Sequence, residues 1–407
     1  MFYCGWVWYN NKIMFNIILL GIASLLTDIS SEMIYPILPF FLVLRLGASP
    51  ALLGFIEGVA ESLSSFLKVF SGYWSDKIKK RKALVISGYA FSLFGKFFLY
   101  ISSTWGLVFL ARILDRFGKG VRTAPRDALI ADSSNEKNRG RNFGLHRALD
   151  TLGACFGIIL VYLFFKGASA DYSKVFFIAL IPAALGVAVL FWVKEKSKSK
   201  LAFSAHLFNS VRNKTEPKIS LREFIPQFKK LDKRLKAFLI IAFIFSLANS
   251  SNQFLLLRAN TLGFNIKLII LLYLVYNISY AVFSYPAGVI SDKVGRKILL
   301  ISGYIFYALV YFGFAFLNSQ EFVWALFAVY GIYSGLTDGI EKAFVSDLSP
   351  VHLRATFIGM HATLVGIGLF PASLIAGFLW SWFGAPAPFI FGGVMSLGAA
   401  VALIKFI

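Results

Sequence analysis

Charged residues are scarce in this chain. Of its 407 residues, 15% are charged and 58% are hydrophobic, and the mean hydropathy is +0.71. A soluble domain has roughly 25% charged and roughly 45–50% apolar residues. The composition therefore excludes an ordinary soluble domain and indicates a protein with most of its surface in lipid.

Cysteine is also rare, and the two present, Cys4 and Cys155, are far apart in the sequence. They form neither a disulfide framework nor a metal-ligand spacing, so we expect no metal and no cofactor. The sequence also lacks a nucleotide-binding loop, a nucleophile–base pair and a signal-peptide pattern. We therefore expect neither an enzyme nor an ATP-driven pump, and Met14 is an alternative start to Met1.

Long apolar segments, by contrast, occupy most of the sequence. A helix that spans a bilayer needs about 20 mostly apolar residues, and hydropathy with Gly and Pro punctuation predicts about twelve such helices. They cover roughly residues 15–46, 51–74, 82–103, 105–131, 142–166, 173–194, 236–262, 265–290, 297–317, 321–347, 354–382 and 385–406.

Lysine and arginine are concentrated in alternate loops. The formal net charge is +21, and basic clusters lie at residues 77–82, 119–147, 194–236 and 293–297. Basic residues gathered on one side of a membrane are the positive-inside pattern, so the charge reflects topology rather than nucleic-acid binding. We expect a multi-pass protein in the lipid bilayer of the plasma membrane, with both termini in the cytoplasm.

One long basic stretch divides the sequence. We expect an N-terminal six-helix bundle over residues 1–194, a cytoplasmic linker over 195–235 and a C-terminal six-helix bundle over 236–407. The linker contains Pro217 and Pro226, and it forms either a surface helix near residues 219–235 or a solvated tether.

The two halves repeat one another. Ile86-Ser-Gly-Tyr89 recurs as Ile301-Ser-Gly-Tyr304, an offset of 215 residues. Apolar helices alone would not keep polar residues in register over such a distance, and internal repeats mark transporters with a site between the repeats. The same offset relates Ala128 to Ala343, Asp132 to Asp347, Arg139 to Arg354, Gly144 to Gly359 and His146 to His361.

A loop motif occurs once in each half. The second copy, residues 288–297, has the form Gly-x-x-x-Asp-Arg/Lys-x-Gly-Arg-Lys/Arg. The first copy has Lys79 in place of the second glycine, and it keeps Gly72, Asp76, Lys77, Lys80 and Arg81. With this pair of motifs the chain resembles the major facilitator superfamily over nearly its whole length.

The resemblance implies a fold and a gate. The fold would be all-α and integral to the membrane, with twelve transmembrane helices in two pseudo-symmetric six-helix bundles. In each motif, glycine would let two helices approach, and the aspartate would cap a helix and pair with a cation to close the cytoplasmic side. The gate residues implied are Gly72, Asp76, Lys77, Arg81, Gly288, Asp292, Lys293, Gly295 and Arg296.

Residues 26–36 and 115–127 resemble a subgroup of bacterial facilitator permeases that are labelled efflux proteins by analogy. The family's fourth-helix arginine, often tied to proton coupling, would correspond to Arg112. The Gly-Pro pair of the family's antiporters is missing from the fifth helix, where only Gly153 and Gly157 keep the spacing. That departure weakens an assignment as a drug–proton antiporter.

Charged residues inside the predicted helices of the first half are candidates for function. An ionised residue at a helix centre costs roughly 2.5–3.5 kcal/mol, so each must pair, face water or become neutral. Helical spacing places them in stripes on the first, second and fourth helices. We expect coupling or substrate binding from Asp28, Glu32, Glu57, Glu61, Arg112, Asp115 and Arg116. Alternatively, Glu57 and Glu61 are structural partners of Lys68 or Arg116.

The second half offers acidic and amide groups instead. Asp338 and Glu341 lie on the tenth helix, and Asn252 and Gln253 lie on the seventh. The basic fourth helix thus has an acidic counterpart, so salt bridges between the halves could form and break during transport. Alternatively, the acids of the tenth helix form a local polar network. For His146 and His361, we expect packing roles.

These observations favour secondary active transport of a small solute by alternating access. We expect coupling to protons through Asp28 or Glu32 beside Arg112 or Arg116, in a monomer, with efflux as the direction suggested by the subgroup. One alternative is uptake or facilitated diffusion of an anionic metabolite or metal chelate. Another is a membrane sensor or a lipid-handling protein that transports nothing.

Overall fold

The computed structural model describes residues 2–78, 80–133, 139–165, 172–195, 232–317, 319–350 and 354–407, and the regular structure in these ranges is helical. The predicted surface helix of the linker falls outside them. The first half contains α1 (Phe2–Ile34), α2 (Leu38–Phe40), the π-helix η1 (Phe41–Arg45), α3 (Pro50–Ile78), α4 (Arg81–Tyr100), α5 (Trp105–Asp132), α6 (Arg139–Phe164) and α7 (Tyr172–Leu190). The second half contains α10 (Lys233–Ser246), α11 (Gln253–Thr261), α12 (Ile266–Val294), α13 (Arg296–Phe316), α14 (Gln320–Leu348), α15 (Arg354–Phe383) and α16 (Ala387–Phe406).

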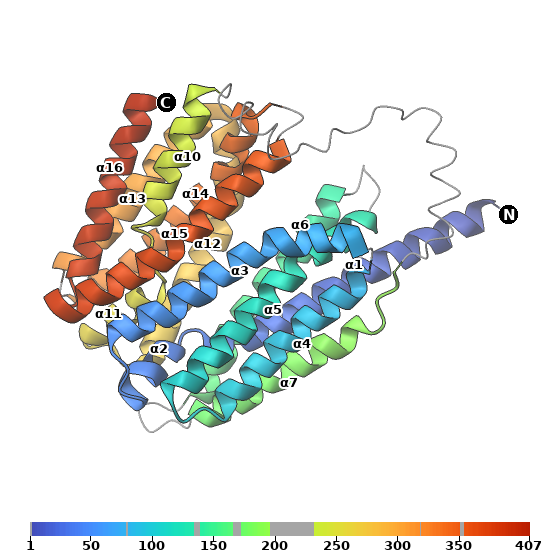
Figure 1. The fold of residues 1–407 in the computed structure, drawn as a ribbon, viewed down its shortest axis with the longest axis horizontal. Coiled ribbons are helices and arrows are strands. Elements are labelled where there is room, and N and C mark those ends of the chain that lie inside the picture. The colour runs from blue at the N-terminus through green and yellow to red at the C-terminus, as the bar shows by residue number, and fades with distance from the viewer. Residues whose placement is uncertain are drawn as a thin grey trace.

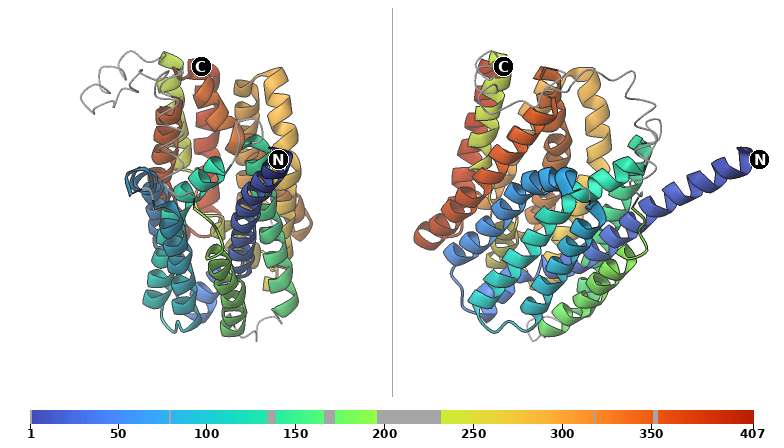
Figure 2. Two further views of the ribbon diagram at one scale, coloured as in Figure 1. Left: turned by 90° about the vertical axis from the view of Figure 1, so that its right-hand side faces the viewer. Right: turned by 45° about the vertical axis from the view of Figure 1, so that its right-hand side comes forward.

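These helices gather into two groups, which Figure 1 shows as blue to green and yellow to red. In the first group α4 packs on α5, and α1 packs on α6 and α7. In the second group α12 and α13 pack on α14, and α13 also packs on α16. The groups meet where α3 crosses α15 and where α6 runs beside α12. Figure 2 shows the same arrangement from two further sides, with the beginning of α1 projecting past the other helices.

Twelve membrane-spanning segments result when α1 is joined with α2 and η1, and α10 with α11. Among the described residues, nine segments are long and apolar enough to cross a membrane by hydropathy alone. The others are α3, α5 and the interrupted pair α10–α11. Their polarity is itself informative, because α3 and α5 carry the charged stripes predicted from the sequence.

Two spans are interrupted, and the prediction of continuous helices over residues 15–46 and 236–262 is wrong at these places. The first break lies at Tyr35–Ile37 and the second at Leu247–Asn252. Pro36 explains the first, since proline lacks the N–H that would continue the helix. The second holds a run of Asn and Ser, whose side chains compete for backbone hydrogen bonds. The repeat offset places Pro36 opposite Ser251, so the two breaks are pseudo-equivalent.

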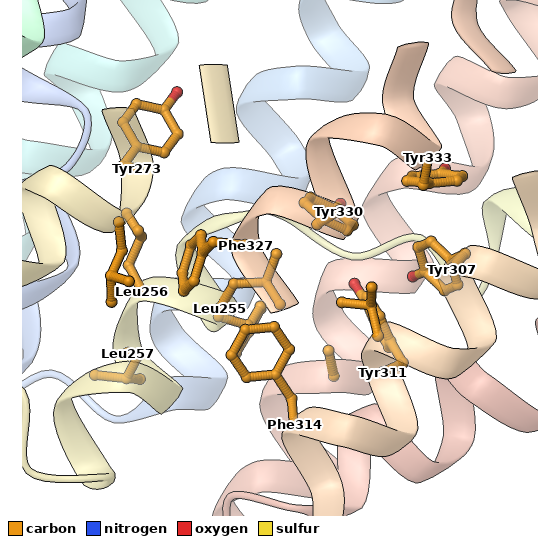
Figure 3. Close-up of a cluster of buried hydrophobic side chains, with 14 of the residues drawn as sticks. Leu255, Leu256, Leu257, Tyr273, Tyr307, Tyr311, Phe314, Phe327, Tyr330 and Tyr333 are labelled. Atoms are coloured by element: carbon orange, nitrogen blue, oxygen red, sulfur yellow. The ribbon is translucent and has the colours of Figure 1, made fainter. Parts of the chain in front are cut away.

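Tyrosines satisfy the backbone and side-chain groups at the second break. The Tyr307 hydroxyl donates to the Ala248 carbonyl at 2.8 Å, and the Tyr330 hydroxyl donates to Asn252 Oδ1 at 2.7 Å. The Tyr307 and Tyr311 rings stack with centroids 4.0 Å apart. Figure 3 shows these rings within the buried cluster of the second half. Since lipid offers no hydrogen bonds, this cluster lets an irregular segment exist inside the bundle.

Glycines allow the two halves to touch along α3 and α15. A methyl group added to Gly58 would lie 2.9 Å from the Phe370 carbonyl oxygen, and one added to Gly377 would lie 2.6 Å from the Pro50 carbonyl oxygen. The Ser62 hydroxyl donates to the Gly366 carbonyl at 2.9 Å. Small residues on both helices thus bring backbone against backbone, as at many membrane helix contacts.

Glycines also set the spacing between α4 and α5. A methyl group added to Gly118 would meet the Gly88 carbonyl and would lie 2.7 Å from the Ser92 amide nitrogen. One added to Gly95 would lie 2.6 Å from the Ala111 carbonyl oxygen. This close contact holds α5, with its charged stripe, at a fixed depth in the first bundle.

We predict that Gly118→Ala lowers stability by about 1–3 kcal/mol, because the added methyl overpacks the α4–α5 contact. Thermal unfolding in detergent micelles measures the change. Gly106→Ala on the same helix is the matched control, since no described atom lies within 4 Å of its added methyl. Equal melting temperatures for the two variants would contradict the close contact.

Candidate functional site

A cavity of about 220 Å³ lies among α1, α3, α4 and α5, and Tyr273 of α12 closes it from the second half. The structure therefore brings most of the predicted first-half residues together at the boundary between the halves. The charged residues that line the cavity are Asp28, Glu32, Glu61, Lys96, Arg112, Asp115, Arg116, Lys119 and Arg122.

Two arginines of α5 pair with two glutamates of α3. Arg112 makes a double contact with Glu57, from Nε to Oε1 and from Nη2 to Oε2, both at 2.7 Å. One turn further on, Arg116 Nη2 lies 2.7 Å from Glu61 Oε1. The four-residue spacing on both helices makes this a ladder of ion pairs. Glu57 is fully buried behind Arg112, so it neutralises the cavity wall rather than lining it.

Asp115 lies between the two arginines of this ladder. Its Oδ2 is 3.6 Å from Arg112 Nη1 and 3.7 Å from Arg116 Nη1. The sequence offered Lys68 or Arg116 as structural partners of Glu57 and Glu61. In the structure Arg116 pairs with Glu61, and Arg112 pairs with Glu57. Such a buried array is stable only when every charge has a partner.

Two further cations are held by uncharged groups. Lys96 Nζ donates to the Thr27 carbonyl at 3.4 Å, which ties α4 to α1. Arg122 donates to the Ser92 hydroxyl and lies over the Tyr89 ring, 4.4 Å from its centroid. Lys96 is therefore stabilised by a carbonyl dipole, and Arg122 by a hydroxyl group and the face of an aromatic ring. Both charges add to the positive potential of the cavity.

Glu32 connects the cavity with the second half. Its Oε2 accepts a hydrogen bond of 3.0 Å from the Tyr273 hydroxyl of α12. Tyr35, at the break after α1, stacks on the same tyrosine with ring centroids 5.4 Å apart. Any change in the charge of Glu32 thus acts directly on a contact between the halves.

Asp28 also has a neighbour from another helix. The Asp150 carboxyl group of α6 lies close to it, and Asp150 Oδ2 lies 3.5 Å from Arg147 Nη1. Two neighbouring carboxylates repel one another, so a proton shared between them would be favourable. Asp150 was not among the predicted residues, although its position inside the predicted fifth helix was a signal for it.

Lys119 differs from its neighbours in the cavity. Within the described part of the chain, no acid lies within ion-pair distance of its ammonium group, although Asp28 and Glu61 line the same cavity. With Lys119, the lining contains five cations and four acids. Glu57, behind Arg112, balances the fifth cation. Lys119 is thus the lining cation whose charge a bound solute could meet.

The predicted residues of the second half lie elsewhere. Asn252 is bound to Tyr330, and Gln253 is fully buried with neither amide atom hydrogen-bonded to a described residue. Asp338 Oδ2 accepts from the Tyr280 hydroxyl at 2.9 Å, and Glu341 contacts Tyr304 and His361. None of these four residues lines the charged cavity.

A second cavity, of about 550 Å³, lies among α6, α12 and α14 and includes Asp338. There Arg147 Nη2 donates to the Tyr280 hydroxyl at 3.4 Å, and Tyr280 in turn donates to Asp338. The polar connection between the halves in this region therefore runs from α6 to α14 through a tyrosine. In this conformation no ion pair between described residues joins the predicted fourth and tenth helices, and Arg112 and Arg116 of α5 pair with α3 instead.

The motif residues are only partly described, since the side chains of Asp76, Lys77 and Asp292 lie outside the described set. Two neighbouring ion pairs repeat between the halves, Arg81 with Asp132, and Arg296 with Asp347 at 2.9 Å from Nε to Oδ2. Each tie lies within one half.

The motif glycines of the second half differ from the expectation of close helix contact, whereas a methyl group added to Gly72 would lie 3.5 Å from Ala124 Cβ of α5. A methyl group added to Gly288 would have no described atom within 4 Å, so no close approach is formed there in this conformation. Gly295 instead ends α12 with a φ of +101°, a backbone conformation that favours glycine. Here the motif shapes a turn.

Comparison with known proteins places the chain in a family. The model of the Major Facilitator Superfamily matches residues 20–265 and 237–407. An uncharacterised MFS-type transporter of Methanocaldococcus jannaschii is 41% identical over 96% of this chain and 94% of its own length. The inner membrane transport protein YajR of Escherichia coli is 23% identical over 93% of this chain and 80% of its own length.

Solved structures show the same fold. The nucleoside transporter NupG matches with a TM-score of 0.76 and 15% identity over 96% of this chain and 98% of its own. A D-xylose-proton symporter matches with a TM-score of 0.75 and 17% identity over 97% of this chain and 98% of its own. With its spans in two groups, the chain belongs to the major facilitator superfamily and is a multi-pass membrane transporter.

Proposed function

We propose that the protein is a proton-coupled secondary transporter that moves a small charged or polar solute through the cavity by alternating access. The observation that carries the proposal is the position of the charges. They are buried in the first half, around a cavity that Tyr273 of the second half also lines, and such transporters bind their cargo where the two repeats meet. Ionised groups in a membrane are costly, and a purely structural bundle has no need of so many.

The proton would bind at Asp28 or Glu32. Asp28 lies close to the Asp150 carboxyl group, and Glu32 accepts a hydrogen bond from a tyrosine of the other half. Protonating Glu32 removes the negative charge that accepts from Tyr273, and it weakens the attraction of Glu32 to the nearby cations. Proton binding therefore alters both the contact between the halves and the charge that the solute meets.

The conformation supports alternating access. The α3–α15 contacts lie in the first part of α3, where the Ala51 amide also donates to the Ser381 hydroxyl at 3.3 Å. By the positive-inside pattern, this closed end is the external one. We therefore assign the structure to a state that opens toward the cytoplasm, in a monomer of the plasma membrane with both termini inside. The domain division at residues 195–235 and the gate at Asp76 and Asp292 belong to the same proposal.

Lys119 favours one variant of this function, the uptake or facilitated diffusion of an anionic metabolite or metal chelate. Lys119 has no acid within ion-pair distance among the described residues, and it lies in a cavity suited to a small molecule. A carboxylate or phosphate on the solute would supply its missing partner. Efflux, suggested by the subgroup resemblance, and uptake differ only in the direction of the gradient that drives the cycle.

We predict that Glu32→Gln abolishes solute movement driven by a pH gradient, since the neutral amide cannot exchange a proton. Proteoliposomes containing pyranine report the proton flux, with solutes that raise the melting temperature in a prior screen. Exchange of labelled for unlabelled solute without a gradient should continue. Asp127→Asn is the control, because Asp127 pairs with Arg126 away from the cavity lining. Gradient-driven flux at the wild-type rate in Glu32→Gln would refute the coupling role of Glu32.

We predict that Lys119→Gln weakens binding of an anionic solute at least about tenfold, equivalent to about 1.4 kcal/mol, because the solute loses its charge partner. Titration calorimetry on the purified protein measures the affinity. Lys405→Gln, at the exposed end of α16, is the matched control. An equal loss of affinity for a neutral solute would show that Lys119 contributes to the shape of the cavity and does not recognise the charge of the solute.

A further inference from the structure

A buried triad of ionisable side chains lies in the second half, apart from both cavities. Glu341 of α14 accepts a hydrogen bond of 3.1 Å from the Tyr304 hydroxyl of α13. Its other oxygen, Oε2, lies 3.3 Å from Nε2 of His361 on α15. The His361 ring is 4% exposed and stacks on Phe238 of α10, with centroids 5.8 Å apart. Four helices therefore enclose the triad.

The histidine ring is not satisfied in this arrangement. Neither of its nitrogens makes a hydrogen bond with a described residue. The Nε2–Oε2 separation is within ion-pair distance, although the ring is not oriented to form a hydrogen bond. A buried polar group without a partner costs about 1–3 kcal/mol. A proton on the ring would offset that cost, because the charged ring would face a carboxylate.

The first half contains the same triad in another form. The repeat offset relates Tyr304 to Tyr89, Glu341 to Arg126 and His361 to His146. There Ser24 contacts all three side chains, at 3.0 Å from the Tyr89 hydroxyl, 2.9 Å from Arg126 Nη1 and 3.1 Å from His146 Nε2. The offset places Leu239 at the position of Ser24 in the second half. The duplication has thus removed the hydroxyl that satisfies the histidine.

The central side chain also differs in what it can do. Arginine stays protonated in proteins, so the first triad has a fixed charge. Glutamate and histidine both change charge, and histidine does so between about pH 5 and 8. We infer that the Tyr304–Glu341–His361 triad is a proton-binding site of the C-terminal half, at which one proton from water binds between the His361 ring and the Glu341 carboxylate.

Two further residues of α14, Tyr333 and Asp338, are close enough to Glu341 to interact with it electrostatically, and Lys342 is close to Asp338. From α10, the apolar Phe238 covers the His361 ring. On α16, Ser396 donates to the Tyr304 carbonyl at 2.7 Å. The part of the Tyr304–Glu341–His361 triad in transport rests on the proposed proton coupling, whereas proton binding at the triad is measurable without any solute.

Histidine NMR tests the site in the full-length protein in lipid nanodiscs. The chain has four histidines, so ¹⁵N-imidazole labelling gives few signals, and His361→Gln assigns the one of interest. We expect the His361 ring to bind a proton as the pH falls, because the charged ring would face the Glu341 carboxylate. In Glu341→Gln the midpoint should move to lower pH by at least about one unit, because the facing carboxylate is gone. The His146 signal should not change in that variant.

A His361 ring that keeps one protonation state from pH 5 to 8, or a midpoint unchanged in Glu341→Gln, overturns the inference. Tyr304→Phe removes one member of the triad without altering a charge. A change in the pH midpoint of the His361 signal in this variant, smaller than that in Glu341→Gln, supports the triad even where Glu341→Gln unfolds. Flux measurements separate this inference from the proposed function. Titration of His361 without gradient-driven flux overturns proton-coupled transport alone, and gradient-driven flux with a silent His361 overturns the triad alone.

Discussion

The pairing of α5 cations with α3 acids is the constraint on which the rest of the structure depends. Arg112 and Arg116 are buried inside a membrane bundle, where an unpaired ion would cost several kcal/mol. Glu57 and Glu61 compensate for them at 2.7 Å. The glycines that bring α4 onto α5 hold this ladder in place. Because the ladder neutralises itself, Lys119 and Asp28 remain available to a solute or a proton.

The sequence predicted much of this, since hydropathy, basic loops and a repeat each follow one physical rule. The twelve spans and the family are confirmed, and most of the charged first-half residues share one cavity. The partner of Glu57 was not predictable, because the rotation of α3 against α5 depends on packing between distant segments. The break near Ser251 was missed because it contains no proline, and the Tyr307 and Tyr330 contacts that stabilise it come from other helices.

The two halves show how a duplicated fold diverges without changing its backbone. Arg81 with Asp132 and Arg296 with Asp347 remain equivalent ties at the helix ends. At the buried triads the repeat positions correspond, whereas the central charge is opposite, and Leu239 stands where the first half has Ser24. The first half thus gained a charged cavity, and the second gained a cluster of tyrosines around its interrupted span. The first half is therefore suited to binding a charged solute, and the second half to stabilising an interrupted helix that can move.

The contact between α3 and α15 has a kinetic consequence. Glycine on both helices leaves few side chains that interlock across it, so separating the halves there requires little rearrangement of rotamers. An interface of interdigitated leucines would be stronger, but each opening would have to withdraw many side chains together. The backbone contact at Gly58 and Gly377 is therefore one that can open without withdrawing many side chains at once.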